Sequence, residues 1–387
     1  MRSFQCLLAV ALFVFNDFSS KRSLNVDASD VHATLNGSAL DFVVFKEQFG
    51  RTYDVDSEEF KRRYLNFKNA TQRHTHLNAF STGSQSAKYG INQFTDLSQK
   101  EFREIYLRAL PERAPSFSGW RTGRLPEKFD WRDKGVVAPV QDQLACGSCW
   151  AFSVVGAVQS VHTIGGSQLE QLSVQQLMDC ASQNDGCNGG SPFGALHWLQ
   201  KTKMKLVTQS EYPYKAKAGI CHVFSQSHVG VAVKNFTAHS FSGQEEALMA
   251  QLVERGPLVA IVDAVSWQDY LGGVIQHHCS SQWANHAVLI VGYDTTESVP
   301  HWIVQNSWGT TWGNGGYVYI KIGGNICGKF DPCLVYFFFF FINLCVCVRV
   351  HTIFLRFLSP LSLFRDCGFR GCCFSLITLT EKRRLYV

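Results

Sequence analysis

The chain has 387 residues, a length typical of about two or three structural units. Hydrophobic residues make up 46% of it and charged residues 17%, which excludes a disordered or fibrous chain. The net charge of +5 comes from residues 329–387, because residues 1–328 carry 28 positive and 28 negative side chains. Without a basic excess before residue 329, nucleic acid is not an expected partner.

The N-terminus predicts export. An apolar run at residues 4–15 follows Met1-Arg2 and is shorter than the roughly 20 residues that span a membrane. We interpret residues 1–20 as a signal peptide, cleaved near Ser20; a buried N-terminal helix or strand is the alternative. The 14 cysteines suit an oxidising compartment, and export agrees with three potential glycosylation sites, at Asn36, Asn69 and Asn235.

Residues 21–124 are polar and rich in charge. Aromatic residues at spacings of three and four predict helical structure over residues 40–77. Prolines and a glycine at positions 111, 115 and 119 then predict a linker. Such a segment, between a signal peptide and a cysteine-rich region, is either a separate binding module or a pro-region.

From Leu125 onwards the pattern changes to short strands, glycines and a few helices. Helices are expected in the first part of this region, and strands dominate the second part. We therefore predict an α+β fold with two lobes. The expected helices lie at 173–178, 193–201 and 244–255, and the expected strands at 258–262, 287–293, 302–305 and 316–322.

The tail, residues 329–387, has a different composition from the rest. It holds 11 of the 30 phenylalanines, five of them consecutive, and six cysteines. A membrane anchor is one interpretation, but the apolar run at 334–348 is short for a span and Arg349 ends it. We favour the interpretation that a retained intron or a shifted reading frame encodes this tail, so a membrane partner is expected only if the tail is genuine.

The segment at residues 143–153 carries the chemistry. Cys149 precedes a run compatible with a helix, and a helix N-terminus favours the nucleophilic thiolate over the thiol. Cys146 lies three residues earlier, so a redox pair and half of a zinc site are rival interpretations. The central stretch holds seven cysteines, so at least one is unpaired if the other six form disulfides.

The sequence Cys146-Gly-Ser-Cys-Trp150 resembles the signature of the papain family of cysteine proteases, and two further motifs agree with it. His286 lies in the segment 285–293, and Asn306 lies in the segment 302–309. The resemblance implies a papain-like two-lobe fold, with a helical lobe, a β-barrel-like lobe and a helical inhibitory pro-region.

The resemblance also implies roles for individual residues. Cys149 would attack the peptide carbonyl, His286 would transfer the proton, and Asn306 would orient the imidazole under the shield of Trp308. Gln143 would stabilise the oxyanion. The implied disulfides are Cys146–Cys187, Cys180–Cys221 and Cys279–Cys327. The implied substrate pocket consists of Gly189, Gly190, Ser191, Pro192, Ala284, Asn285 and Trp308.

The pro-region resembles the inhibitory segment of the same family. Residues 90–96 fit one motif, and Glu59, Arg63, Phe67 and Asn78 fit four of the six positions of another, whereas Ala70 and His74 depart from it. We therefore expect a zymogen with domains at 21–124 and 125–328, cleaved near Arg124. The expected partners are protein and peptide substrates, the chain's own propeptide and cystatin-like inhibitors; the expected state is a monomer, in the lysosome or secreted, without metal or organic cofactor.

Two departures from the family pattern leave alternatives open. Leu144 stands where the family usually has glycine, and the pattern stops at residue 328, so the strand that normally closes the second lobe is expected to be missing. No exopeptidase insertion is recognised between Cys187 and Cys221, and His277-His278 falls elsewhere, which favours an endopeptidase. A catalytically inactive binding protein of the same fold and a thiol–disulfide oxidoreductase are the alternatives.

Overall fold

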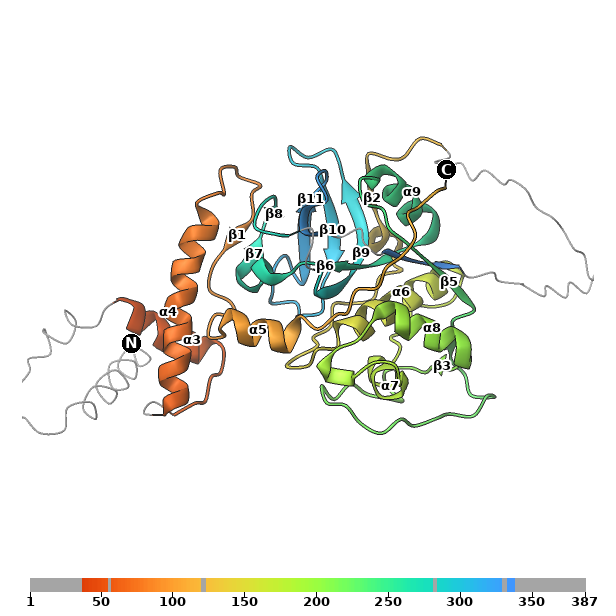
Figure 1. Ribbon diagram of the computed structural model, residues 1–387, viewed down its shortest axis with the longest axis horizontal. Helices are drawn as coiled ribbons and strands as arrows, with labels where there is room; N and C mark the ends of the chain where they lie inside the picture. The colour runs from red at the N-terminus through yellow and green to blue at the C-terminus, as the bar shows by residue number, and fades with distance from the viewer. Residues whose placement is uncertain (1–36, 55–56, 120–122, 281–283, 329–332, 338–387) are drawn as a thin grey trace, which may run out of the picture. The chain divides into compact units, whose positions relative to one another are not determined.

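The computed structural model describes residues 37–54, 57–119, 123–280, 284–328 and 333–337. The predicted signal peptide, Asn36 and most of the tail lie outside the described residues. The following account is confined to the part of the chain up to residue 337 (Figure 1).

The pro-region begins with two helices where the sequence predicted one continuous helical stretch. Helix α3 (Gly37–Gln48) is followed by Gly50, whose φ of 59° is the left-handed conformation that ends helices. Helix α4 (Glu58–Asn78) begins at Ser57, whose side chain accepts a hydrogen bond from the backbone of Phe60. The predicted aromatic stripe joins the two helices, with Phe42, Phe45 and Phe67 at its buried centre. Strand β1 (Lys88–Tyr89) and helix α5 (Gln99–Tyr106) complete the regular structure of the pro-region.

The first lobe of the following domain is mainly helical, as the sequence predicted. Its central helix, α6 (Cys149–Ile164), is buried along most of its length, because small and apolar residues occupy its whole surface. Around it lie α7 (Val174–Cys180), η2 (Gly186–Asn188), α8 (Pro192–Thr202) and the short pair β3 (Lys205–Leu206) and β4 (Val231–Ala232).

The second lobe is built on an eight-stranded sheet in the order β5-β12-β6-β9-β10-β11-β8, with β2 also paired to β9. All its pairs are antiparallel except β8–β11. The sheet is open within the described residues, so the barrel-like lobe expected from the resemblance is not a closed barrel. The strands are β2 (Lys128–Asp130), β5 (Asn235–His239), β6 (Leu258–Val262), β8 (Val274–Ile275), β9 (His286–Asp294), β10 (His301–Gln305), β11 (Tyr317–Lys321) and β12 (Cys333–Phe337).

Shorter elements connect these strands. Helix α9 (Glu245–Arg255) ends at Gly256, whose φ is 108°. Strand β7 (Tyr270–Gly272) pairs with β1 of the pro-region, antiparallel to it. The 3₁₀ turns are η1 (Trp131–Lys134), η3 (Val265–Asp269) and η4 (Ile326–Gly328).

Strand β12 differs from the expectation that the last strand is missing. It lies within the unusual tail and pairs with both β5 and β6, and β5 has no other partner strand among the described residues. Its sequence, Cys-Leu-Val-Tyr-Phe, is rich in residues that favour strands, which is the physical reason that this segment can occupy the place. The domain boundary at residue 328 stays a prediction.

Candidate active site

Cys149 is the first residue of α6 and has no exposed surface. It is the free cysteine among the residues whose side chains are described. Burial raises the pKa of its thiol to about 11, although the nearby backbone of Ala287 and Arg108 acts in the opposite direction. The thiol is therefore protonated in this form of the protein.

His286 begins β9, and Asn306 follows the last residue of β10. Their side chains meet, with 2.7 Å between His286 Nε2 and Asn306 Oδ1. The Asn306 oxygen also accepts the Ser307 N–H at 2.8 Å, so it acts as an acceptor and the imidazole donates from Nε2. His286 Nδ1 is buried without a hydrogen-bond partner. Nδ1 is thus the ring nitrogen that can accept a proton, and the nearby backbone of Tyr106 in the pro-region acts to raise the pKa of the ring.

The surroundings of His286 are apolar. The Trp308 ring lies over the imidazole, with 4.7 Å between centroids, and burial lowers the pKa of His286 to about 4 against the opposing effect of Asn306. Ala287, the next residue, belongs to the same buried apolar cluster as Cys149. The strand that carries the histidine therefore runs beside the thiol.

Gln143 is fully buried, and its amide is held in one orientation. Its Oε1 accepts hydrogen bonds from Ser307 Oγ at 2.7 Å and Trp308 Nε1 at 3.1 Å. Its Nε2 donates to the carbonyl of Cys146 at 2.8 Å and to that of Tyr106 at 3.4 Å. The NH₂ group therefore faces the pro-region, and a carbonyl oxygen already lies at this donor.

Three disulfides link Cys146–Cys187, Cys180–Cys221 and Cys279–Cys327, the pairs that the resemblance implied. Because Cys146 is bonded to Cys187, it cannot form a disulfide with Cys149. This pairing contradicts the oxidoreductase alternative and the half-zinc-site interpretation. Within the described parts of the chain, no group of three or more His, Cys, Asp or Glu side chains could hold a metal ion.

The pro-region passes directly over the predicted pocket, and its main chain makes most of the contacts. The N–H groups of Ala109 and Leu110 donate to the carbonyls of Asn285 at 3.0 Å and Gly190 at 2.9 Å. Gly190 returns a bond to the Arg108 carbonyl at 3.2 Å. A Cβ atom on Gly189 would lie 2.4 Å from that same carbonyl oxygen, so glycine is required for the close approach.

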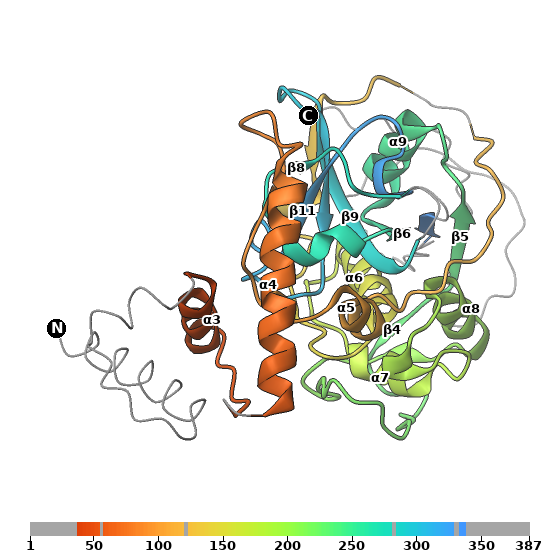
Figure 2. The ribbon, with the colours of Figure 1, turned by 60° about the vertical axis from the view of Figure 1, so that its left-hand side comes forward.

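The remaining predicted pocket residues lie around these contacts. Ser191 caps α8 by accepting the Gly194 N–H at 3.0 Å, and Pro192 is the first residue of that helix. Ala284 packs on the small cluster that contains Cys149 and Ala109. Figure 2 shows α5, which ends at Tyr106, in front of α6. The predicted catalytic and pocket residues therefore lie in one region, and the pro-region covers it.

The sequence missed several residues of this region. Ile261 and Ala287 form the apolar cluster around Cys149, and nothing in a buried strand distinguishes such residues. The Tyr214 hydroxyl lies 2.8 Å from both the Gln143 carbonyl and Ser148 Oγ, and no local pattern links positions so far apart. Ser307, which holds the Gln143 amide, is next to Asn306 in the recognised motif and could have been found.

Leu144 adopts a left-handed backbone, with φ of 52°. Its N–H donates to Asp142 Oδ1 at 2.8 Å, and its side chain is 53% exposed. The position therefore suits glycine, as the departure from the family pattern indicated. The leucine side chain points to solvent and leaves the Gln143 hydrogen bonds intact.

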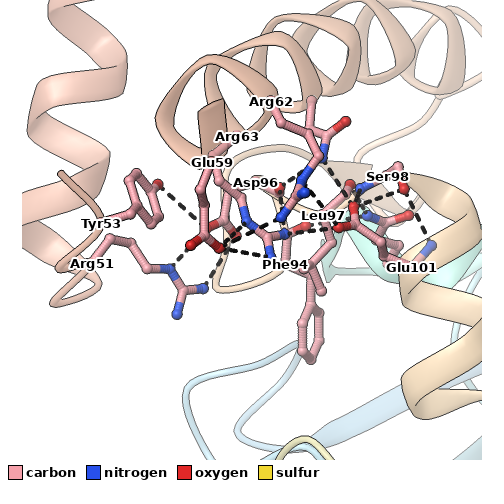
Figure 3. Close-up of polar contacts among 12 residues, drawn as sticks. Arg51, Tyr53, Glu59, Arg62, Arg63, Phe94, Asp96, Leu97, Ser98 and Glu101 are labelled. Atoms are coloured by element: carbon pink, nitrogen blue, oxygen red, sulfur yellow. Dashed lines mark hydrogen bonds and ion pairs between the residues drawn. The ribbon is translucent and has the colours of Figure 1, made fainter. Parts of the chain in front are cut away.

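A polar network holds the pro-region together beside the site (Figure 3). Arg51 forms an ion pair with the buried Asp96 at 3.0 Å, and Tyr53 donates to the same carboxylate at 3.4 Å. From α4, Arg63 and Asn66 donate to the Asp96 carbonyl at 3.2 and 3.1 Å. These contacts tie α4 to the segment that leads into α5.

The two positions of α4 that depart from the family pattern are both buried. Ala70 has no exposed surface, and His74 Nε2 lies 3.0 Å from Asp269 Oδ1 in η3. Arg73 binds both oxygens of the same carboxylate, at 2.5 and 2.8 Å. This ion pair lowers the pKa of Asp269 despite burial. His74 therefore contacts the following domain through the same carboxylate as Arg73.

The pair His277-His278 lies beside the C-terminal end of α4. The His278 ring packs against Phe80, with 4.8 Å between centroids, and against His76 at 5.8 Å. Burial lowers the pKa of His278. The pair thus contacts the pro-region. None of the described helices is long and apolar enough to cross a membrane.

Comparison with known proteins gives two family matches, and the first extends past residue 328, where the family pattern was expected to stop. Residues 125–335 match the profile described as papain family cysteine protease, and residues 42–102 match the cathepsin propeptide inhibitor domain. Cathepsin O from Homo sapiens is 54% identical over 70% of this chain and 86% of its own length. Cathepsin O from Mus musculus is 51% identical over 72% and 90%.

Solved structures agree with these relatives. Procathepsin L2 from Tenebrio molitor superimposes with a TM-score of 0.70 at 29% identity, over 78% of this chain and 100% of that one. The stem bromelain precursor gives a TM-score of 0.69 at 32% identity, over 77% and 98%. The sequence of residues 152–157, 172–176, 267–273 and 276–280 resembles that of cathepsin O, and the curated relatives confirm this likeness.

Proposed function

Because the chain belongs to the papain family of cysteine proteases, we propose that it is the zymogen of an endopeptidase whose active site is Cys149, His286 and Asn306. One observation carries the proposal. The imidazole of His286 donates to Asn306 at 2.7 Å and keeps Nδ1 free, on the strand that runs beside the unpaired thiol.

Each residue then has a chemical role. Cys149 gives its proton to His286 and attacks the peptide carbonyl as a thiolate, and His286 returns the proton to the leaving amine. Water then hydrolyses the thioester with His286 as the base. Gln143 Nε2 and the Cys149 N–H stabilise the oxyanion, since the Gln143 amide is already fixed by Ser307 and Trp308.

The pro-region is the inhibitor of this site. Its chain at 106–110 occupies the donors and carbonyls that a substrate would use, and Gly189, Gly190, Ser191, Pro192, Ala284, Asn285 and Trp308 form the substrate pocket beneath it. Removal of residues 21–124 by cleavage near Arg124 opens the site. No exopeptidase insertion narrows it, so cleavage within polypeptide chains follows.

The predicted signal peptide places the enzyme in the secretory pathway, in the lysosome or outside the cell. Asn69 and Asn235 are exposed, as glycosylation requires. The processed enzyme acts as a monomer in protein degradation, and cystatin-like proteins are its expected inhibitors. Catalysis needs no cofactor, because thiolate, imidazole and amide supply all its steps.

The test uses the full chain, acid-processed and offered a fluorogenic dipeptide substrate and an epoxysuccinyl thiol-protease inhibitor. We expect one inhibitor adduct on Cys149 and hydrolysis that Cys149→Ala lowers at least about 10⁴-fold. Ser160→Ala, on the same helix, is the control for folding and keeps both readouts. Soluble protein with the three disulfides formed but with no adduct would instead support the inactive binding protein.

A further inference from the structure

The pro-region also caps one edge of the sheet, away from the catalytic residues. Strand β5 is the last strand on its side of the sheet among the described residues. Directly after it, Ser240 forms a parallel bridge with Ser116 of the pro-region. Its N–H donates to the Pro115 carbonyl and its carbonyl accepts from the Phe117 N–H, both at 2.9 Å. An extended chain thus continues the sheet at a free edge, as many bound peptides do.

Beside this bridge, the rings of Phe241 and His239 form a contact site for Phe117, which we call the aromatic seat. The Phe117 ring stacks on Phe241, with 4.8 Å between centroids and 26° between planes, and meets the His239 ring edge-on at 5.4 Å. With Phe117 in place, Phe241 has no exposed surface, and His239 Nδ1 is buried without a partner. When the pro-region leaves, these two rings lose their cover while Ser240 regains a free donor and acceptor.

The seat is continuous with the substrate pocket. The same stretch of chain pairs with Gly190 at Ala109 and with Ser240 at Ser116. Figure 2 shows this stretch running from α5 past α8 to β5. Ala109 and Phe117 are eight positions apart (117 − 109 = 8), so one extended polypeptide reaches both places.

We propose that the processed enzyme uses the Phe241–His239 seat as an exosite for an aromatic side chain of an extended polypeptide substrate. In such a substrate, the aromatic residue and the residue that pairs with Gly190 lie on the same side of the scissile bond. The aromatic residue is about eight positions farther from that bond. Backbone pairing to Ser240 holds the chain without regard to sequence, and the ring stack supplies the preference. The inference rests on the proposed function, because it assigns a further contact to the same substrates.

Binding tests the seat without catalysis. The probe is a labelled peptide of residues 106–119, titrated into the Cys149→Ser protein from which an added protease has removed the pro-region. We expect Phe117→Ala in the peptide to weaken binding about tenfold, the size expected for one ring that loses its apolar contact. Leu110→Ala is the control, since the Leu110 side chain is 59% exposed and its contact is through the main chain. Equal binding of all three peptides would overturn the seat.

Kinetics then test its use by substrates. The substrates are long fluorescence-quenched peptides that share one cleavage sequence. They carry phenylalanine or alanine six to ten positions from the residue that pairs with Gly190, on the side away from the scissile bond. We expect phenylalanine near position eight to lower KM about threefold to tenfold, with kcat unchanged, because the contact is remote from the reacting atoms. Phe241→Leu removes this gain. Phe236→Leu, in β5, keeps it, because the Phe236 ring packs on Phe193 of α8 and not on the seat.

The outcomes separate the two proposals. If neither a short dipeptide substrate nor the long peptides are cleaved, the proposed function fails, and the peptide titration alone decides on the seat. If both are cleaved and no position of phenylalanine changes KM, the exosite is wrong while the protease stands.

Discussion

Two of the contacts by which the pro-region holds the peptidase domain have opposite character. At α4, Arg73 and His74 bind the buried carboxylate of Asp269 through charge and side-chain geometry. Over the active site, Ala109 and Leu110 bind Asn285 and Gly190 through the main chain. The first contact depends on particular side chains, whereas the second depends on the backbone and can form with almost any sequence. Of these two contacts, side chains carry the one at α4, and the backbone carries the one over the substrate pocket.

Breaking the ion pair should give the largest effect. Asp269→Asn leaves Arg73 without its charge partner at a site where both side chains are largely covered. We expect the contact between α4 and the peptidase domain to weaken by about 3 kcal/mol, because the Arg73 charge stays buried and unpaired. This corresponds to a roughly 100-fold shift of the zymogen towards its open form. The rate at which iodoacetamide alkylates Cys149 in the zymogen measures this opening.

Lys100→Gln is the matched control for that experiment, since Lys100 and its partner Glu104 are both exposed. It should change the alkylation rate little. An unchanged rate in Asp269→Asn would mean that the contact at α4 does not hold the zymogen closed.

The main-chain contact should give a smaller effect that depends on the backbone alone. Leu110→Pro removes the N–H that donates to Gly190, and we expect opening to increase about fivefold, the worth of one hydrogen bond. Leu110→Ala keeps the N–H and should behave as the original chain does. The same alkylation assay compares the two, and a large effect of the alanine variant would show that side-chain recognition operates here too.

Acid should weaken the contact at α4 through His278 and not through Asp269. Burial lowers the pKa of His278, so its stabilising contribution is present above about pH 6.5 and is lost as the pH falls below that value. His76 and His277, which lie beside it, also act to lower the pKa of His278. The pKa of Asp269 is lowered, so its carboxylate stays ionised at pH 5 and the ion pair persists.

His278→Asn tests this pH dependence, because asparagine tolerates the left-handed backbone at that position, where φ is 67°. Between pH 7 and pH 5, the opening of the zymogen should increase by a factor that is a few-fold smaller in this variant than in the original chain. His197→Asn, on α8, is the control. The same increase in both variants would remove His278 from the mechanism.

Leu144→Gly should give the smallest effect and spare both contacts. Glycine relieves the left-handed strain of a leucine but loses more entropy on folding, so we expect a net gain of about 0.5–1 kcal/mol. Thermal unfolding of the zymogen should rise by a few degrees, with unchanged Cys149 alkylation. A lower midpoint would show that the leucine side chain makes a contact worth more than the strain.

The same division into side-chain and main-chain contacts explains what the sequence could predict. Cys149, His286, Asn306 and Gln143 stand in motifs whose chemistry fixes the residue type, so they were found. Ile261 was missed, because any apolar residue of a buried strand looks alike in sequence. The Arg73–Asp269 contact joins positions 196 residues apart, and no local pattern reports such a pairing.

The tail shows the limit in the other direction. Its phenylalanine run indicated a segment that does not belong to the fold, yet residues 333–337 form β12 between β5 and β6. Strand pairing uses the backbone, so an apolar, strand-forming segment can fill a place in a sheet with few side-chain requirements, and the family match itself reaches residue 335. A comparison of motifs detects which side chains are absent. It does not detect that a strand can still form from other residues.

The most direct measurement is the pH profile of Cys149 alkylation in the zymogen and in the processed enzyme. Covered by residues 106–109, the thiol has a pKa of about 11, so the zymogen should react slowly below pH 9. Removal of the pro-region admits water and frees His286 to hold the proton, so the processed enzyme should be alkylated rapidly at pH 5–6. Two identical profiles would contradict the account, because Cys149 would then be neither covered by the pro-region nor activated by His286.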